Sequence, residues 1–415
     1  MHVVRSVCLL AILATLAHGP AAAEAPAIRA LAVTGQSAPG GGMFERFSVD
    51  AQPIVAPVNG RGQVAFFAAL SRSAASEGLF LAAGGRITKV ALEGDPVPGG
   101  GAISGLGRHP VPSLNESGTV AFAAAVAGGK TVEGIFTSAR GRLQAVALAG
   151  TQAPGIPSGT FASLDAPSLN DRGDVAFLAS VRRGRETIDA IYLRAAGKLH
   201  KVVAQGDPAP SGGTFAAFGF PTLNNRGAVA FGAVVEGPAV PGGVFVSDGG
   251  AIRMVVGAGE PVPIGGIFAK FSERIAFNDA GVLAFHAILK NAPVAMGVFI
   301  VDGGRMRMVA AIGDGAPGGG TFSHFGLWPA IDAAGALGFA ASVDGGPDRV
   351  GLYVTGSTSA RRLAVVGDPA PGGGRLATFT LYPSLAMARS GAVTFAAATS
   401  APSGSAEGIY LIAAP

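Results

Sequence analysis

The chain has 415 residues, of which 49% are apolar and only 13% are charged, and its formal net charge is +4 at pH 7. After the N-terminus, no uninterrupted apolar run approaches the roughly 18 residues that a membrane-spanning helix needs. Lys and Arg are scattered along the chain rather than clustered. We therefore expect a soluble mature chain with no nucleic-acid partner.

The first residues have the pattern of a secretory signal. His2 and Arg5 precede an apolar segment over residues 7–17, and small residues at 21–23 precede Glu24. This order predicts a signal peptide over residues 1–23 and export to the periplasm or the medium. Cys8, the only cysteine, lies at the front of the apolar segment, so the expected mature chain has no disulfide, no thiolate metal site and no lipid-modified N-terminus.

The first element after the signal is a strand-like segment over residues 27–34, followed by a loop rich in Pro and Gly. The same pair of features recurs six more times. The strand-like segments occupy residues 87–94, 143–150, 199–206, 252–259, 306–313 and 363–367.

Each unit continues through a segment of the form F-x-x-F-x-x-P-x-L-N, clearest at residues 215–224, and turns at N-x-x-G into V-A-F. Asn starts a type I turn and Gly takes the left-handed position, which is a common way to join antiparallel strands. A variable loop, a third strand and a short Gly turn follow. The Gly and Phe of the pattern recur every 54 to 56 residues at Gly62/Phe66, Gly118/Phe122, Gly173/Phe177, Gly227/Phe231, Gly281/Phe285, Gly335/Phe339 and Gly391/Phe395.

Four short strands per unit of about 55 residues are typical of a propeller blade. The chain begins with a fourth-type strand and stops at a third-type strand, so the two ends complete one blade and close a ring. We predict a single all-β domain over residues 24–415, a seven-bladed β-propeller of four-stranded blades closed by residues 27–34. An open all-β repeat array is the alternative. The predicted blades span about residues 43–93, 102–149, 160–205, 214–258, 267–312, 321–366 and 375–415.

These N-x-x-G-x-x-A-F tandem repeats resemble those of a family of exported bacterial proteins that often carry varied C-terminal anchors. The resemblance covers the whole mature chain and implies a propeller-like fold without an established activity. The chain ends at Pro415 without such an anchor, so we expect a free exported protein. One turn carries Asp332 and the last reads Met387-Ala388-Arg389-Ser390, whereas the motif's Asn is present at Asn59, Asn115, Asn170, Asn224 and Asn278.

The crossover loops of the form G-[DQE]-x-x-P-G-G-G are the most conspicuous candidates for chemistry. A ring of carboxylates could bind a cation, but an Asp at this place usually bonds the loop backbone, and we favour that structural role. We therefore predict no metal and no cofactor. The carboxylates are Asp95, Asp207, Asp314 and Asp368, with Gln36, Gln152 and Glu260 in the other three loops.

The residues give no support for a particular enzyme. The four histidines after the signal fall at unrelated repeat positions, and no G-x-S-x-G turn occurs. We favour an exported, non-enzymatic binding or scaffold module. The alternative is a propeller-type carbohydrate hydrolase or lyase that draws its carboxylates from several blades.

Positions where the repeats differ indicate a ligand site, because binding sites on repeat scaffolds are usually built from variable loops. Aromatic residues beside cations suit an anionic or sugar-like ligand. A polysaccharide, a cell-envelope component or a protein is the expected partner of a monomer. An alternative role for the aromatic residues is to plug the channel. The candidate ligand-binding residues are Arg182, Arg183, Arg185, Phe220, Trp328 and Tyr382.

Overall fold

The computed structural model describes residues 27–47, 55–106, 111–237, 240–355, 359–379, 384–402 and 404–414. These residues form 34 β-strands. None of the described residues belongs to a helix long and apolar enough to cross a bilayer. The predicted signal peptide lies outside the described residues.

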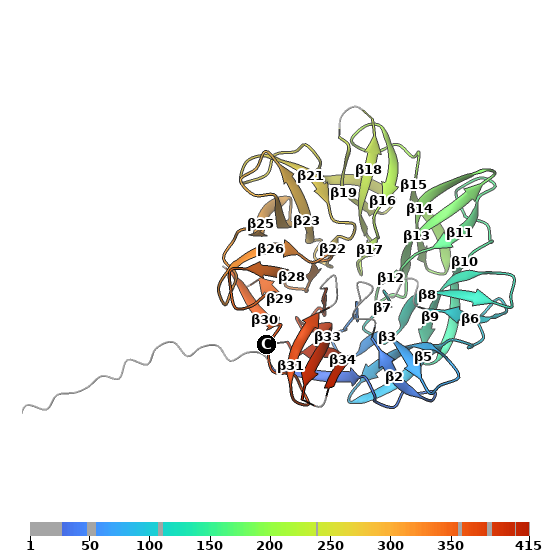
Figure 1. The fold of residues 1–415 in the computed structure, drawn as a ribbon. Coiled ribbons are helices and arrows are strands. Elements are labelled where there is room, and N and C mark those ends of the chain that lie inside the picture. Colours follow the sequence, from blue (N-terminus) through green and yellow to red (C-terminus); the bar gives the residue numbers. More distant parts are fainter. Residues whose placement is uncertain are drawn as a thin grey trace, which may run out of the picture.

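Seven antiparallel sheets surround one axis, so the predicted all-β, seven-bladed propeller is confirmed (Figure 1). Blade 1 contains β2 (Met43–Arg46), β3 (Val64–Ser71), β4 (Glu77–Ala83) and β5 (Arg86–Leu92). Blade 2 contains β6 (Ala102–Gly105), β7 (Ser113–Leu114), β8 (Val120–Ala127), β9 (Glu133–Ala139) and β10 (Arg142–Leu148). Blade 3 contains β11 (Thr160–Leu164), β12 (Ser168–Leu169), β13 (Val175–Arg183), β14 (Glu186–Ala195) and β15 (Lys198–Ala204).

The other four blades repeat this order. Blade 4 contains β16 (Thr214–Phe218), β17 (Thr222–Leu223), β18 (Val229–Glu236), β19 (Gly242–Asp248) and β20 (Ala251–Gly257). Blade 5 contains β21 (Ile267–Phe271), β22 (Ala276–Phe277), β23 (Leu283–Lys290), β24 (Met296–Asp302) and β25 (Arg305–Ala311). Blade 6 contains β26 (Thr321–Phe325), β27 (Ala330–Ile331), β28 (Leu337–Asp344), β29 (Val350–Thr355) and β30 (Ala360–Val365). Blade 7 contains β31 (Arg375–Phe379), β32 (Ala386–Met387), β33 (Val393–Ala401), β34 (Gly404–Ile412) and, from the other end of the chain, β1 (Ile28–Val33).

The innermost strand is divided in two, which the sequence did not predict. In blade 4, β16 pairs with the end of β18 near Ala233, and β17 pairs with its start at Val229. Pro221 lies between the two pieces and has no backbone N–H to donate to the ladder. The same break occurs in blade 5, where Ile275 occupies the corresponding place.

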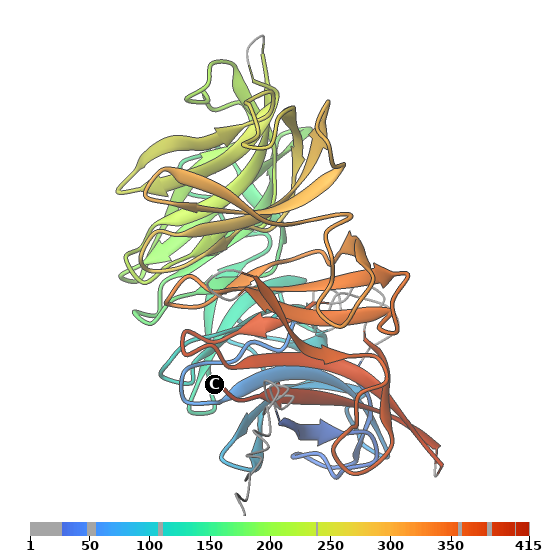
Figure 2. The ribbon, with the colours of Figure 1, turned by 90° about the vertical axis from the view of Figure 1, so that its left-hand side faces the viewer.

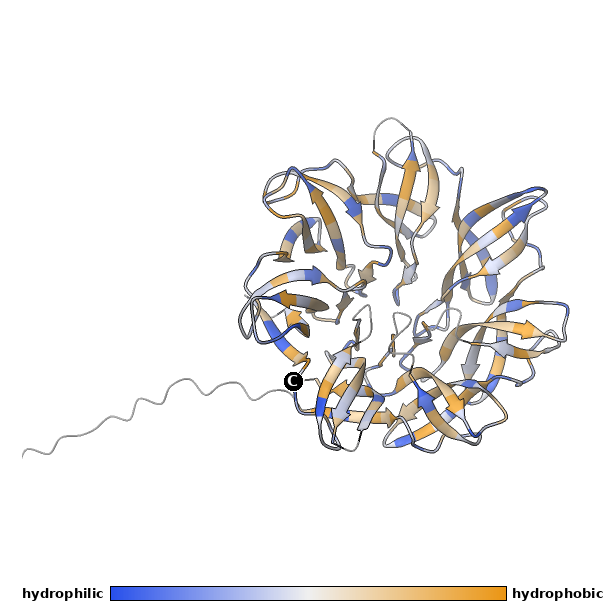
Figure 3. Cartoon of the chain, in the orientation of Figure 1, coloured by the Kyte–Doolittle hydropathy of each residue, from blue (hydrophilic) through white to orange (hydrophobic). Residues whose placement is uncertain are grey.

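The core lies within the blades and between neighbouring ones, since Val203 of blade 3 and Phe231 of blade 4 belong to one buried cluster. Phe231 and Phe245 stack with their ring centroids 5.8 Å apart, and Phe215 meets Phe245 edge-on at 5.1 Å. The apolar residues follow the strands of every blade (Figure 3). The repeated phenylalanines predicted to form the core are each at most 1% exposed, namely Phe66, Phe122, Phe177, Phe231, Phe285, Phe339 and Phe395.

Strand β1 lies beside β34, so residues from both ends of the chain share blade 7. The two strands pair antiparallel, from Ile28 opposite Ile412 to Val33 opposite Gly408. The N-terminal and C-terminal strands lie together in both views of the ring (Figures 1 and 2). The Phe47 amide of blade 1 donates to the Glu407 Oε2 atom of blade 7 at 2.6 Å. This pairing is the one that the predicted ring closure requires.

Candidate functional site

The N-x-x-G turns converge around the axis at one face of the ring. In blade 4, the Asn224 Oδ1 atom accepts hydrogen bonds from the amides of Arg226 at 3.1 Å and Ala228 at 3.0 Å, and Gly227 has a φ of 91°. The Asn224 Nδ2 atom donates to the Asn278 carbonyl of the next blade at 3.3 Å. Corresponding bonds link six blades through what we call the asparagine girdle, which consists of Asn59, Asn115, Asn170, Asn224, Asn278 and Asp332.

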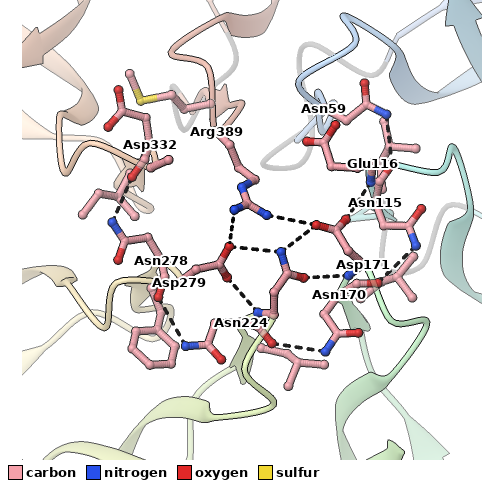
Figure 4. Close-up of a pocket in the computed structure, with 18 of the residues that line it drawn as sticks. Asn59, Asn115, Glu116, Asn170, Asp171, Asn224, Asn278, Asp279, Asp332 and Arg389 are labelled. Carbon is pink, nitrogen blue, oxygen red and sulfur yellow. Dashed lines mark hydrogen bonds and ion pairs between the residues drawn. The ribbon is translucent and has the colours of Figure 1, made fainter. Parts of the chain in front are cut away.

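A second layer of polar side chains lies nearer the channel axis than this girdle, at the mouth of the channel (Figure 4). The Asn225 Nδ2 atom donates to the Oδ2 atoms of Asp171 at 2.6 Å and Asp279 at 3.0 Å. Arg389 from blade 7 forms ion pairs with the same two oxygens, at 3.0 Å to Asp171 and 2.6 Å to Asp279. Together with Glu116, these residues line a cavity of about 220 Å³, which we call the mouth.

The two aspartates of the mouth have all four carboxylate oxygens occupied. The Asp171 Oδ1 atom accepts a hydrogen bond from the Glu116 amide at 2.8 Å, and the Asp279 Oδ1 atom accepts one from the Asn225 amide at 2.7 Å. General acid catalysis needs a carboxyl group that holds a proton within reach of a leaving group. The geometry therefore suits a structural closure better than an acid–base pair. Within the described residues, no three His, Cys, Asp or Glu side chains are placed to hold a metal ion.

A larger cavity, of about 460 Å³, opens between blades 4 and 5. Phe218, Phe220 and Phe271 are each only partly buried and line it. Val234 adds an apolar side chain that is 51% exposed. We call this cavity the blade 4–5 recess, and its lining includes Leu178, Phe218, Gly219, Phe220, Gly232, Val234, Pro241, Lys270, Phe271, Ser272 and Glu273.

Two glycines form the floor of the recess. The Gly219 amide donates to the Gly232 carbonyl at 2.9 Å, and the Phe220 amide donates to the Glu273 carbonyl of blade 5 at 2.9 Å. A Cβ atom on Gly219 would lie 2.1 Å from that Glu273 oxygen, so only glycine permits this approach of the two backbones. The other blades carry a side chain at the place of Gly232, for example Leu178 in blade 3, so blade 4 alone has a glycine there.

The rim of the recess carries free charges of both signs. Lys270 and Glu273 are exposed, and neither takes part in an ion pair with another described residue. Aromatic faces beside hydrogen-bonding groups are the usual composition of a small-molecule site of a few hundred Å³. The recess therefore has the size and the chemistry to hold a ligand with an apolar face and polar edges.

Comparison with protein-family models gives the relationship of the chain. A model described as a family of unknown function, DUF7453, matches residues 21–299 and 290–414. The chain belongs to this family. A search of curated proteins found no match. The N-x-x-G-x-x-A-F repeats and the anchor class expected from the resemblance remain a prediction, whereas the propeller-like fold that it implied is present.

Solved structures share the architecture at low identity. An oligogalacturonate lyase in complex with manganese has a TM-score of 0.51 and 14% identity, over 94% of this chain and 98% of that one. A puromycin-hydrolyzing peptidase of Mycobacterium tuberculosis has a TM-score of 0.49 and 13% identity, over 87% and 53%. Polysaccharide lyase Uly1 has a TM-score of 0.48 and 9% identity, over 92% and 95%. At 14% identity, the likeness to the oligogalacturonate lyase shows the fold alone.

Two of the three aromatic candidates, Phe220 and Trp328, lie at the axis. Trp328 is only 7% exposed and meets Phe220 edge-on, with the ring centroids 6.1 Å apart. This is the channel plug that the sequence offered as the alternative role, although Phe220 also lines the recess. Tyr382 lies outside the described residues. We call the cluster the axial plug, and it comprises Val55, Val111, Ala166, Phe220 and Trp328.

The arginine candidates lie apart from these rings. Arg182 and Arg183 end β13, and Arg185 follows in the turn, where all three are exposed. The Arg183 guanidinium pairs with Glu186 at 3.1 Å. Among the described residues, no hydrogen bond, ion pair or ring contact joins these arginines to Phe220, so the structure does not bring the predicted set together as one site.

The crossover-loop aspartates bond their own loops. The Asp207 Oδ2 atom accepts the Ala204 amide at 2.8 Å and also pairs with Lys201 at 2.8 Å. The equivalent backbone bonds reach Leu92, Ala311 and Val365, from Asp95, Asp314 and Asp368 respectively.

Two elements of the site were missed by sequence reasoning. The turn at Arg389 was recognised as altered, but no role was assigned to it. The loss of a side chain at Gly232 was visible in the repeat alignment and was not used. Both are departures from the repeat, which is the same signal that led to the aromatic candidates.

The girdle provides a stability test. Asn224→Ala removes the acceptor of two backbone amides, and an unsatisfied buried amide is costly. We expect the free energy of unfolding to fall by about 1–2 kcal/mol, measured from the urea midpoint. Asn224→Asp is the matched variant, because blade 6 naturally carries Asp332 and its Oδ1 atom still accepts the Ala336 amide at 2.8 Å. An alanine variant as stable as the parent would show that the girdle is not structural.

Proposed function

We propose that the chain is an exported, non-enzymatic binding module that holds a sugar-like ligand in the blade 4–5 recess. The observation that carries the proposal is the recess itself, a cavity of about 460 Å³ lined by Gly219 and Gly232. Its volume falls within the usual range of ligand pockets, about 300–1,000 Å³. Export is inferred from the predicted signal over residues 1–23.

The composition of the recess favours a carbohydrate over a purely apolar ligand. A sugar ring has an apolar face that packs against aromatic rings, here those of Phe218 and Phe271, and hydroxyl groups around its edge. Lys270 and Glu273, which form no ion pair with another described residue, offer a donor and an acceptor at the rim for those hydroxyls. A ligand without polar edges would leave both charged groups unused.

The test uses the fluorescence of Trp328, the only tryptophan, whose ring contacts Phe220 at the edge of the recess. We expect neutral glucan or N-acetylglucosamine oligosaccharides to change this fluorescence with saturation. Gly232→Leu introduces the side chain that blade 3 carries at Leu178 and fills the recess, so we expect affinity to fall at least about tenfold, or about 1.4 kcal/mol.

Arg183→Ala is the matched control, because it alters the competing candidate surface on blade 3. Its affinity should equal that of the parent. Equal binding by the parent and Gly232→Leu would remove the recess from consideration. The mixtures of protein and oligosaccharide from these titrations are also analysed for shortened or unsaturated products. Turnover would replace the binding module with the alternative, a carbohydrate hydrolase or lyase.

A further inference from the structure

A third cavity lies on the axis, between the asparagine girdle and the axial plug. It encloses about 220 Å³, and we call it the axial chamber. Most of its lining is apolar, including Phe277 and Met387, and none of the described residues that line it is acidic. Apart from the indole N–H of Trp328, the polar side chains among the described lining residues are Ser113, Thr222 and Arg274.

Arg274 is the unusual member of this lining. It occupies the position at which the other described blades place the apolar residues of the axial plug, and its guanidinium carbon lies 5.4 Å from the ring centroid of Trp328. No hydrogen bond or ion pair to its guanidinium is present among the described residues. Burial lowers the pKa of Arg274 to about 10, so the group keeps its charge at neutral pH.

Arg274 is only partly buried, but even partial withdrawal of a cation from water without a counter-ion is costly, and proteins usually pair such a group. One contact with an aromatic ring offsets only part of this cost, about 0.5–2 kcal/mol. The described residues of the chamber therefore supply no negative charge to balance that of Arg274.

The hydroxyl groups of the chamber indicate which kind of anionic group would fit there. The Thr222 hydroxyl is buried and has no hydrogen-bond partner. The Ser113 Oγ atom accepts the Leu169 amide at 2.9 Å, which leaves its own hydrogen to be donated. A guanidinium and two hydroxyl donors suit a ligand group that only accepts hydrogen bonds, and a carboxylate is such a group.

We propose that the axial chamber binds a small carboxylate with an apolar body, in which the carboxylate pairs with Arg274 and accepts a hydrogen bond from Thr222. The size agrees with this class, because an apolar cavity of about 150 Å³ holds benzene. The remaining space accommodates a carboxylate group. The apolar body lies against Phe277 and Met387.

The mouth is the route to the chamber. The two cavities share a collar of apolar side chains, and Arg389 with its two aspartates lies outside that collar. Arg389→Ala opens this route without changing any residue that lines the chamber. The shared collar residues are Val58, Leu114, Phe277, Ile331 and Met387.

Benzoate is the probe, and benzyl alcohol is its uncharged counterpart. We expect benzoate to change the Trp328 fluorescence with saturation, to raise the denaturant midpoint, and to bind at least tenfold more tightly than benzyl alcohol. Arg274→Met keeps an unbranched side chain, although a shorter one, and removes the charge. It should weaken benzoate at least tenfold and leave benzyl alcohol nearly unchanged.

Arg305→Met is the matched control, because Arg305 is an exposed arginine of the same blade, and benzoate should bind this variant as it binds the parent. The titration is repeated with Arg389→Ala, in which the mouth is open, so that slow entry of benzoate is distinguished from lack of affinity for it. Benzoate binding that survives Arg274→Met overturns the proposal. So does the absence of saturable binding in both the parent and Arg389→Ala.

Discussion

Deletion of residues 27–34 should remove about 5 kcal/mol or more from the free energy of unfolding, which is comparable with the whole stability of many domains. The deletion strips β34 of its outer partner and exposes an unpaired strand edge. It also removes Ala32, which is 1% exposed in the contact between blades 7 and 1. We expect aggregation or a greatly lowered denaturant midpoint.

Two point variants separate closure from a general effect of altering the N-terminus. Ala32→Asp places a charge in the buried contact and should reproduce much of the loss. Arg29→Gln changes an exposed residue of the same strand and should be nearly neutral. If the truncated protein unfolds at the same midpoint as the parent, β1 does not close the ring.

The architecture was predictable because it depends on what the repeats share. Seven copies of one pattern, with Gly at each turn, Asn at five of the turns and a buried Phe at one offset, specify seven similar sheets. The chain begins with a fourth-type strand and stops at a third-type strand, and this offset predicted that the first strand joins the last blade. The division of the inner strand was missed, because a proline within a repeat shows that one ladder bond is absent but not that pairing resumes on both sides of it.

The sites were less predictable because they depend on where the repeats differ and on which residues the ring brings together. Arg389 and Asp171 are 218 positions apart, and only closure of the ring places them across the same mouth. The recess depends on backbone approach at Gly219, which leaves no side-chain signal. The Arg182–Arg185 segment was a good candidate by charge, yet it ends on the exposed tip of the β13–β14 hairpin.

Acid should destabilise the protein through His286. This residue is 6% exposed, its ring lies 5.8 Å from that of Phe325, and its Nε2 atom has no hydrogen-bond partner. Burial lowers the pKa of His286 to about 4, and a hydrogen bond with the Gly326 backbone opposes this only in part. The folded protein therefore keeps the imidazole neutral under conditions in which the unfolded chain protonates it.

The direction of the pH dependence follows from that difference. The unfolded chain takes up a proton as the pH falls below about 6.5, whereas the folded protein does so only near pH 4, so the stability is complete above 6.5 and is lost between these values. The free energy of unfolding should decrease by about 2–3 kcal/mol between pH 7 and 4.5 because of this residue alone.

Urea unfolding at several pH values measures this decrease. His286→Leu, which introduces the residue of blade 3, should flatten the curve over this range, and His324→Gln, at an exposed position, should not. An unchanged slope in His286→Leu would assign the acid sensitivity to other groups.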